Sequence, residues 1–169
     1  LHFRQVFKVL ELMGYDWANH CVHVDFGLMK FKDGKMSTRK GNVVLLEDLL
    51  VEAVERVRKI IEEKNPSLEN KETVAHEVGI GAVIFANLST RRNKDVIFDW
   101  DAVLNFEGET GPYVQYTHAR LCSILRKYGK PVITDIRYEL LKEDEAVILT
   151  KNLSLFASTI MKAAEAYEP

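Results

Sequence analysis

The residues of this sequence that are best suited to chemistry gather in a polar stretch from Lys35 to Gly41. The stretch contains three cations and two hydroxyls, namely Lys35, Arg39, Lys40, Ser37 and Thr38. Cationic side chains neutralise the charge of a polyphosphate, while hydroxyls and backbone amides supply oriented hydrogen-bond donors. The stretch has neither helical nor strand periodicity. These residues suit a phosphate-binding loop, although composition alone favours a solvated basic loop.

This loop does not match the P-loop of nucleotide-binding proteins. Gly27 and Gly34 enclose six residues where that motif has four. Met36 follows Lys35 at the place where the motif has a serine or threonine. Any phosphate site here would therefore belong to another class.

A second candidate site is a stripe of aromatic and basic side chains on a helix predicted to end at about Tyr128. Its members recur at three- and four-residue steps: Tyr113, Tyr116, Arg120, Ser123 and Lys127. Such a stripe can bind phosphates or stack on bases, at roughly 1–3 kcal/mol per stacked base. A separate basic cluster occupies Arg91, Arg92 and Lys94. Taken alone, each pattern is more typical of an ordinary solvated face, with an RNA surface as the alternative.

A metal site is not predicted. His20 and His23 would point to opposite faces of a strand, and no further pair of ligands lies near them in the sequence. The two cysteines, Cys21 and Cys122, lie far apart and outside any C-x-x-C pattern. Their spacing favours a reducing compartment without structural disulfides.

Composition bounds the remaining possibilities. The 169 residues carry 23 basic and 25 acidic side chains, so an RNA surface would have to be a local patch. No apolar run approaches the roughly 20 residues that a membrane span requires, and no signal-peptide pattern opens the chain. Since the sequence starts at Leu1 and stops at Pro169 beside a helical pattern, we expect a piece of a longer cytoplasmic protein.

The elements that would position these residues are mostly helical. Apolar periodicity predicts helices over 3–13, 46–61, 71–88 and 110–128, and two short helices within 143–167 that break near Ser154. Alternation predicts a strand over 21–26. Thr110 is a suitable N-cap, with Pro112 in the first turn. Gly79 and Gly81 indicate the close approach of another backbone.

The apolar faces of two of these helices are explicit predictions. The first face comprises Leu46, Leu49, Leu50, Ala53, Val54, Val57, Ile60 and Ile61. The second comprises Val74, Val78, Ala82, Phe85 and Leu88. The predicted fold is mainly α, a helical bundle preceded by a short strand and loop region.

Several of these stretches resemble one family. Lys35-Met36-Ser37-Thr38-Arg39 resembles the KMSKS signature of class I aminoacyl-tRNA synthetases, whose loop closes over the triphosphate of ATP. The runs 23–28, 35–44, 98–100 and 106–120 resemble arginyl-tRNA synthetases, in the right order. The cysteine synthetase is a relative with a similar helical domain, but the zinc ligands that it would need are missing. After residue 130 only a compatible helical pattern continues.

Two departures from the family pattern matter. Thr38 stands where the signature has a second lysine, and Arg39 stands where it has a serine. This leaves open whether Lys35, Arg39 or Lys40 makes the main phosphate contact; the resemblance favours Lys35. The His-x-Gly-His element of the class is absent, so we expect residues 1–169 to be inactive alone.

The resemblance implies the end of a Rossmann-like class I catalytic domain over 1–109. The start of a helical DALR-type anticodon-binding domain would follow over 110–169. The whole enzyme would activate L-arginine with ATP and Mg²⁺ and charge tRNA(Arg), as a monomer without membrane attachment. Its catalytic residues would be Lys35, Ser37 and Thr38. The ATP site would comprise Lys35, Met36, Ser37, Thr38, Arg39, Lys40, His23 and Gly27. The tRNA contacts would be Arg91, Arg92, Lys94, Tyr113, Tyr116, Arg120 and Lys127.

Two other functional classes compete with this interpretation. A non-catalytic helical RNA-binding module would not need a Lys-Met-Ser loop after a strand. A protein-interaction bundle would need neither that loop nor the stripe of tyrosine and arginine. The stretch from Lys35 to Gly41 therefore separates the enzyme from both alternatives.

Overall fold

The structure, a computed structural model, describes residues 1–31, 45–131 and 137–169. The predicted phosphate loop from Lys35 to Gly41 lies outside the described residues. Within them, the α-helices are α1 (His2–Leu12), α2 (Leu46–Lys64), α3 (Lys71–Leu88), α4 (Trp100–Val103), α5 (Gly111–Tyr128) and α6 (Asp144–Ala166). The 3-10 helices are η1 (Asp16–His20) and η3 (Tyr138–Leu140), and the strands are β1 (Met29–Phe31) and β2 (Val96–Phe98). The fold is therefore mainly helical, as predicted.

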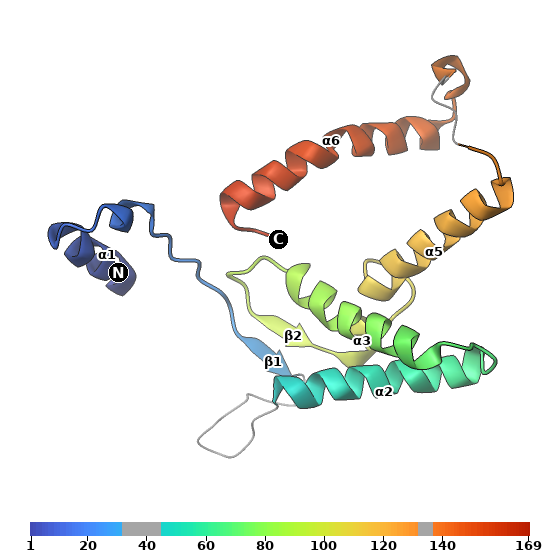
Figure 1. The fold of residues 1–169 in the computed structure, drawn as a ribbon, viewed down its shortest axis with the longest axis horizontal. Helices are drawn as coiled ribbons and strands as arrows, with labels where there is room; N and C mark the ends of the chain where they lie inside the picture. Colours follow the sequence, from blue (N-terminus) through green and yellow to red (C-terminus); the bar gives the residue numbers. More distant parts are fainter. Residues whose placement is uncertain (32–44, 132–136) are drawn as a thin grey trace.

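The centre of the molecule is the helix pair α2 and α3, which lie side by side and cover the two-stranded sheet (Figure 1). The strands β1 and β2 run parallel, with Lys30 opposite Ile97. Parallel strands need a crossover connection, and the chain between them supplies α2 and α3. The buried core gathers Leu49, Ala53, Val57, Ala75, Ala82, Val83, Phe98, Val103 and Leu104.

The helix α2 forms because its sequence agrees with helix physics at several levels. Its first turn carries Glu47 and Asp48, where the helix dipole favours negative charge. Arg56 bonds Glu52 at 2.7 Å, one turn away. The predicted apolar face is confirmed at its centre but wrong at Leu46, which is 67% exposed. Leu46 is the first residue of α2 and is not among the described residues that pack against the core.

The helix α3 approaches α2 closely because of a glycine. A Cβ on Gly79 would lie 2.9 Å from the backbone N of Val54 and 3.0 Å from the carbonyl O of Ala53. This confirms the predicted backbone approach. At Gly81, by contrast, the neighbour is the side chain of Gln115 from α5.

The prediction of the inward face of α3 is wrong at the last residue of the helix. Leu88 is 45% exposed, whereas Ala82 and Val83 are buried. The chain leaves the helix directly after Leu88, so the core does not extend to it.

The N-cap of α5 is the one that the sequence predicts. Thr110 Oγ1 accepts a hydrogen bond from the Tyr113 amide at 3.3 Å, and Pro112 lies in the first turn. Gly129 ends the helix with φ +63°, in the left-handed region that glycine adopts without a steric penalty.

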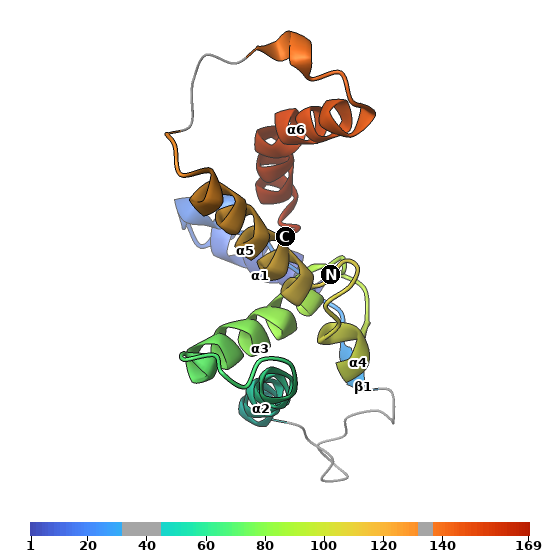
Figure 2. The same ribbon diagram turned by 90° about the vertical axis from the view of Figure 1, so that its right-hand side faces the viewer.

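The predicted break in the last helix is wrong, because α6 continues through Ser154. The hydroxyl of Ser154 bonds the carbonyl of Lys151 at 2.7 Å, so the serine is satisfied inside the helix. No glycine or proline interrupts this segment. From the far end of α5, α6 runs back so that its C-terminal end lies near the turn between α3 and β2 (Figures 1 and 2).

The predicted strand over 21–26 is also wrong. These residues form no strand, and the chain pairs only from Met29 onward, where β2 provides a partner. Val22 and Val24 are exposed, so the alternating pattern does not face a core of described residues. None of the described helices is long and apolar enough to cross a membrane.

Candidate functional site

The described residues on both sides of the predicted phosphate loop belong to one packed unit. β1 ends at Phe31, whose ring lies 5.4 Å from that of Phe98. Phe98 in turn packs edge-on against Trp100 at 4.8 Å. α2 begins at Leu46, and its Leu49 lies in the same core. The entrance and exit of the segment 32–44 are thus joined to one hydrophobic core.

Gly27, predicted to border the ATP site, lies against the turn between α3 and β2. Its amide donates a hydrogen bond to the carbonyl of Arg92 at 2.6 Å. A Cβ at this position would collide with the carbonyl of Lys94. The space beside this contact is a cavity of about 400 Å³ that Gly27, Arg91, Arg92 and Lys94 line together. The structure therefore brings one predicted ATP residue next to the predicted basic cluster.

The three members of this cluster differ in their surroundings. Arg92 pairs with the carboxylate of Asp25 and donates to the Asp25 carbonyl at 2.8 Å. Its Nε also lies 3.9 Å from Glu168, and its side chain is only 24% exposed. Arg91 and Lys94 are exposed, and their side chains make no hydrogen bond or ion pair with another described residue.

Two carboxylates next to this turn are held in the ionised form. The hydrogen bond from Arg92 lowers the pKa of Asp25 below its ordinary value. The ammonium of Lys30 lowers the pKa of Asp95 in the same way, helped by the amide of Leu28, which donates to Asp95 Oδ1 at 2.9 Å. Lys30 is therefore paired with Asp95.

His23, the other residue predicted to border ATP, lies apart from Gly27. Its ring stacks on that of Phe3 from α1, with centroids 3.9 Å apart. His23 lines a separate cavity of about 680 Å³ together with Phe3 and other residues of α1. The described residues thus do not bring His23 and Gly27 into one cavity. They also contain no group of three residues that could hold a metal ion.

The stripe on α5 is exposed at its aromatic positions. Tyr113 and Tyr116 are 43% and 48% exposed. Arg120 lies over the Tyr116 ring at 5.7 Å and donates to its hydroxyl at 3.4 Å. A guanidinium beside exposed rings offers both charge and stacking surface to a nucleic acid. Apolar residues of α5 beside this stripe are exposed as well, as Leu121 and Ile124 show.

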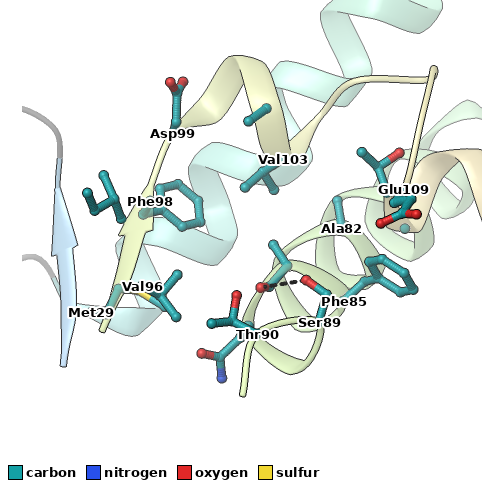
Figure 3. A pocket seen from close by; sticks show the side chains of 16 residues that line it. Met29, Ala82, Phe85, Ser89, Thr90, Val96, Phe98, Asp99, Val103 and Glu109 are labelled. Carbon is teal, nitrogen blue, oxygen red and sulfur yellow. Dashed lines mark hydrogen bonds between the residues drawn. The ribbon is translucent and has the colours of Figure 1, made fainter. Parts of the chain in front are cut away.

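A further cavity, of about 200 Å³, lies between α3, β2, α4 and the start of α5 (Figure 3). Ala82 and Phe85 line it from α3, and Val103 lines it from α4. Asp99 and Glu109 stand at its rim. Its lining includes none of the residues predicted to bind ATP or tRNA.

Sequence reasoning missed three carboxylates that organise this region: Asp25, Asp95 and Glu168. They lie 65 to 76 residues from their partners along the chain. No local pattern could have singled them out.

Comparison with known families gives two matches along the chain. Residues 1–100 match the family described as tRNA synthetases class I (R), catalytic domain. Residues 114–169 match the DALR anticodon binding domain. The first match alone covers more than half of the 169 residues.

Individual relatives agree with these matches. The chain is 55% identical over its whole length to an arginine--tRNA ligase of Clostridium beijerinckii, and 54% identical to one of Halothermothrix orenii. It spans about 30% of the length of each of these relatives.

Solved structures show the same likeness. The arginyl-tRNA synthetase of Thermus thermophilus superposes with a TM-score of 0.80 at 36% identity, over 97% of this chain and 27% of that one. The enzyme from Plasmodium falciparum has a TM-score of 0.73 at 23% identity, over 97% of this chain and 28% of that one, and shows the same fold. On the match of residues 1–100, the chain belongs to the class I tRNA synthetases of the arginine type.

Proposed function

We propose that the whole protein containing this chain is an arginine--tRNA ligase. It would join the arginine carboxylate to the α-phosphate of ATP with release of pyrophosphate, and then pass the arginyl group to tRNA(Arg) with release of AMP. The observation that carries this proposal is the match of residues 1–100 to the class I (R) catalytic domain. Since the chain spans about 30% of its relatives' length, we expect residues 1–169 to be inactive alone.

The ATP chemistry is assigned to the loop that resembles KMSKS. Adenylate formation builds negative charge on the α-phosphoryl and pyrophosphate oxygens, and preorganised cations and donors stabilise that charge. Lys35 would supply the main cation, with Ser37 and Thr38 as hydrogen-bond donors. Met36, Arg39 and Lys40 would complete the contact with ATP and its accompanying Mg²⁺. Gly27 would border the site, whereas His23 lines a separate cavity beside α1.

The tRNA surface is assigned to exposed cations and rings. The stripe Tyr113, Tyr116, Arg120 and Lys127 on α5 is supported by its exposure and by the match of 114–169 to an anticodon-binding domain. Arg91 and Lys94 would add contacts to the tRNA, because their side chains are exposed and free of partners among the described residues.

The domain boundary is placed at Thr110, the N-cap of α5. Residues 1–109 would then end the catalytic domain, and residues 110–169 would begin the anticodon-binding domain. A cytoplasmic location and a monomeric state complete the proposal and stay predictions.

The test is aminoacylation with the full-length protein, every amino acid and total tRNA, with residues 1–169 as the control. We expect charging with arginine only, and none by the control. Charging with another amino acid would keep the class and refute arginine. RNA binding without charging of any amino acid would favour a non-catalytic RNA-binding module.

The role of Lys35 has its own measurement. Lys35→Ala in the full-length enzyme is expected to slow arginine-dependent pyrophosphate exchange by about 10² to 10³-fold, the usual cost of losing one preorganised donor. Lys59→Ala is the matched control, since Lys59 is an exposed lysine of α2 with a single weak ion pair at 3.8 Å. Exchange near the wild-type rate in Lys35→Ala would remove Lys35 from the mechanism.

A further inference from the structure

The turn between α3 and β2 holds the segment that leads into β1 by backbone hydrogen bonds. The Gly27 amide donates to the Arg92 carbonyl at 2.6 Å, and the Val96 amide donates to the Leu28 carbonyl at 2.9 Å. The Leu28 amide donates to Asp95 at 2.9 Å. The amides of Gly27 and Leu28 and the carbonyl of Leu28 are thus all hydrogen-bonded to residues 92–96. These bonds position the chain directly before β1.

Ion pairs reinforce the same contact on both sides. Arg92 pairs with Asp25 before the glycine, and Asp95 pairs with Lys30 after it. The Arg92 guanidinium also bonds the Asp25 carbonyl, so it contacts both the backbone and the side chain of that residue. We call the turn from Arg92 to Asp95 the clamp, and the residues 25–30 that it holds the clamped segment.

The clamp also receives the end of α6. The Arg92 amide donates to Glu168 Oε2 at 3.4 Å, and Arg92 Nε lies 3.9 Å from Glu168 Oε1. Both contacts thus join Glu168, two residues beyond the end of α6, to the clamp. Tyr167 directs the chain there by adopting φ +53°, a left-handed conformation that costs a non-glycine residue roughly 1–2 kcal/mol.

We propose that Arg92 is a positioning residue for the ATP-dependent step, and that Glu168 couples α6 to it. Arg92 fixes residues 25–30, from which the chain runs through β1 toward Lys35. Glu168 binds the same guanidinium from the region that matches the anticodon-binding domain. A displacement of the end of α6 would thus reach the clamped segment through one side chain. The inference rests on the proposed function, because that function places ATP chemistry at Lys35.

The surroundings of Arg92 favour this role over direct contact with tRNA. Its side chain is 24% exposed, and two carboxylates already bind it. A tRNA phosphate would have to displace one of these carboxylates and would meet the negative charge of the other. Arg91, the preceding residue, is exposed and has no such partner. The two neighbouring arginines therefore provide a matched pair.

The experiment compares Arg92→Ala with Arg91→Ala in the full-length enzyme. Arginine-dependent pyrophosphate exchange is measured at saturating tRNA, and the Kd for tRNA is measured separately. Because misplacement of a reacting group by about 1 Å can cost about 10²-fold, we expect Arg92→Ala to lower kcat about 10- to 100-fold with an unchanged tRNA Kd. We expect Arg91→Ala to weaken tRNA binding. Lys59→Ala, at an exposed lysine outside the proposed sites, should leave both kcat and the tRNA Kd unchanged.

Two further variants test the chemistry of the contact. Arg92→Lys keeps one positive charge near Asp25 and should recover part of the lost kcat. Glu168→Gln removes the charge contributed by the residues that follow α6 and should lower kcat about two- to threefold, the range expected for a weak, partly exposed ion pair. If Arg92→Ala does not fold, Arg92→Lys and Asp25→Asn are compared with Arg91→Ala instead, with the same measurements of kcat and tRNA Kd.

Amide hydrogen exchange at Gly27 and Leu28 gives a readout that does not depend on activity. We expect Arg92→Ala to accelerate exchange at both amides, and Arg91→Ala to leave it unchanged. An unchanged kcat with a weaker tRNA Kd in Arg92→Ala would overturn the inference and make Arg92 a tRNA contact. Unchanged amide exchange would overturn it as well. If the wild-type enzyme shows no arginine-dependent exchange, the proposed function fails, and the amide exchange alone decides on the clamp.

Discussion

The helices α3 and α6 are 18 and 23 residues long, and they are fixed in the molecule in opposite ways. α3 buries Ala75, Gly79, Ala82 and Val83, whereas no residue of α6 is buried among those described. The small side chains of α3 let it approach α2 closely. α6 instead presents large apolar side chains such as Phe156 to no described partner, and its polar attachment is Glu168. Apolar packing thus holds α3 in place, whereas an ion pair of Glu168 holds the end of α6.

The first prediction is that the same Phe→Ala substitution lowers the free energy of unfolding much more in the packed core than in α6. Phe98 is 3% exposed and packs between Phe31 and Trp100, so Phe98→Ala should destabilise residues 1–169 by about 3–5 kcal/mol. Phe156→Ala in α6 should change the stability by no more than about 0.5 kcal/mol, since that ring is 66% exposed. Urea unfolding of both variants measures this. Similar losses would contradict the contrast.

A second prediction concerns the close approach that distinguishes α3. Gly79→Ala places a Cβ against the backbone of Val54 and Ala53, which cannot move aside alone, and should cost about 1–3 kcal/mol. Gly81→Ala is the matched control. Its Cβ would meet only the amide end of the Gln115 side chain, 2.8 Å away, which can rotate, and alanine improves helix propensity by about 1 kcal/mol. Thermal unfolding should therefore show a lower Tm for Gly79→Ala than for Gly81→Ala.

The smallest expected effect is the response of the charged contacts to acid. The pKa of Asp25 and that of Asp95 are lowered in the folded protein, by Arg92 and Lys30 respectively. Their contribution to stability is therefore present above about pH 4, the unfolded value, and is lost as the pH falls through the lower folded values. Both carboxylates are substantially exposed, so salt should screen the effect.

Carboxyl NMR titration measures this response directly. Asp25 and Asp95 should titrate below the ordinary range, and Arg92→Ala should return Asp25 alone to about pH 4. An ordinary titration midpoint for Asp25 in the wild-type chain would contradict the ion pair. Among the described residues, the packed core around Phe98 contains no titratable group, so its packing should not respond in this range.

The helices could be predicted from the sequence because their signals are local. The bounds of α3 follow from apolar periodicity, and those of α5 follow from Thr110 and Gly129 at its ends. The break near Ser154 was predicted wrongly because the sequence does not show that the serine hydroxyl bonds its own helix.

The sheet and the clamp could not be predicted, because they depend on distant partners. β1 has only three residues, and each pairs with a residue 67 positions later. The alternation at 21–26 is the stronger local signal, yet none of the described strands pairs with it. In the same way, the sequence shows Arg91 and Arg92 as equivalent cations. Only the fold shows that Asp25 and Glu168 bind one of them.

The parallel pairing of β1 with β2 has a consequence for synthesis of the chain. β1 leaves the ribosome well before its partner, because residue 98 follows residue 31 by 67 positions. At about 5–20 residues per second, the strand waits roughly 3–13 s for β2. The helices α2 and α3 can form and pair during this interval, since their contacts are local in sequence. An unpaired apolar strand invites aggregation, and the charge of Lys30 at its centre discourages association with other chains during the wait.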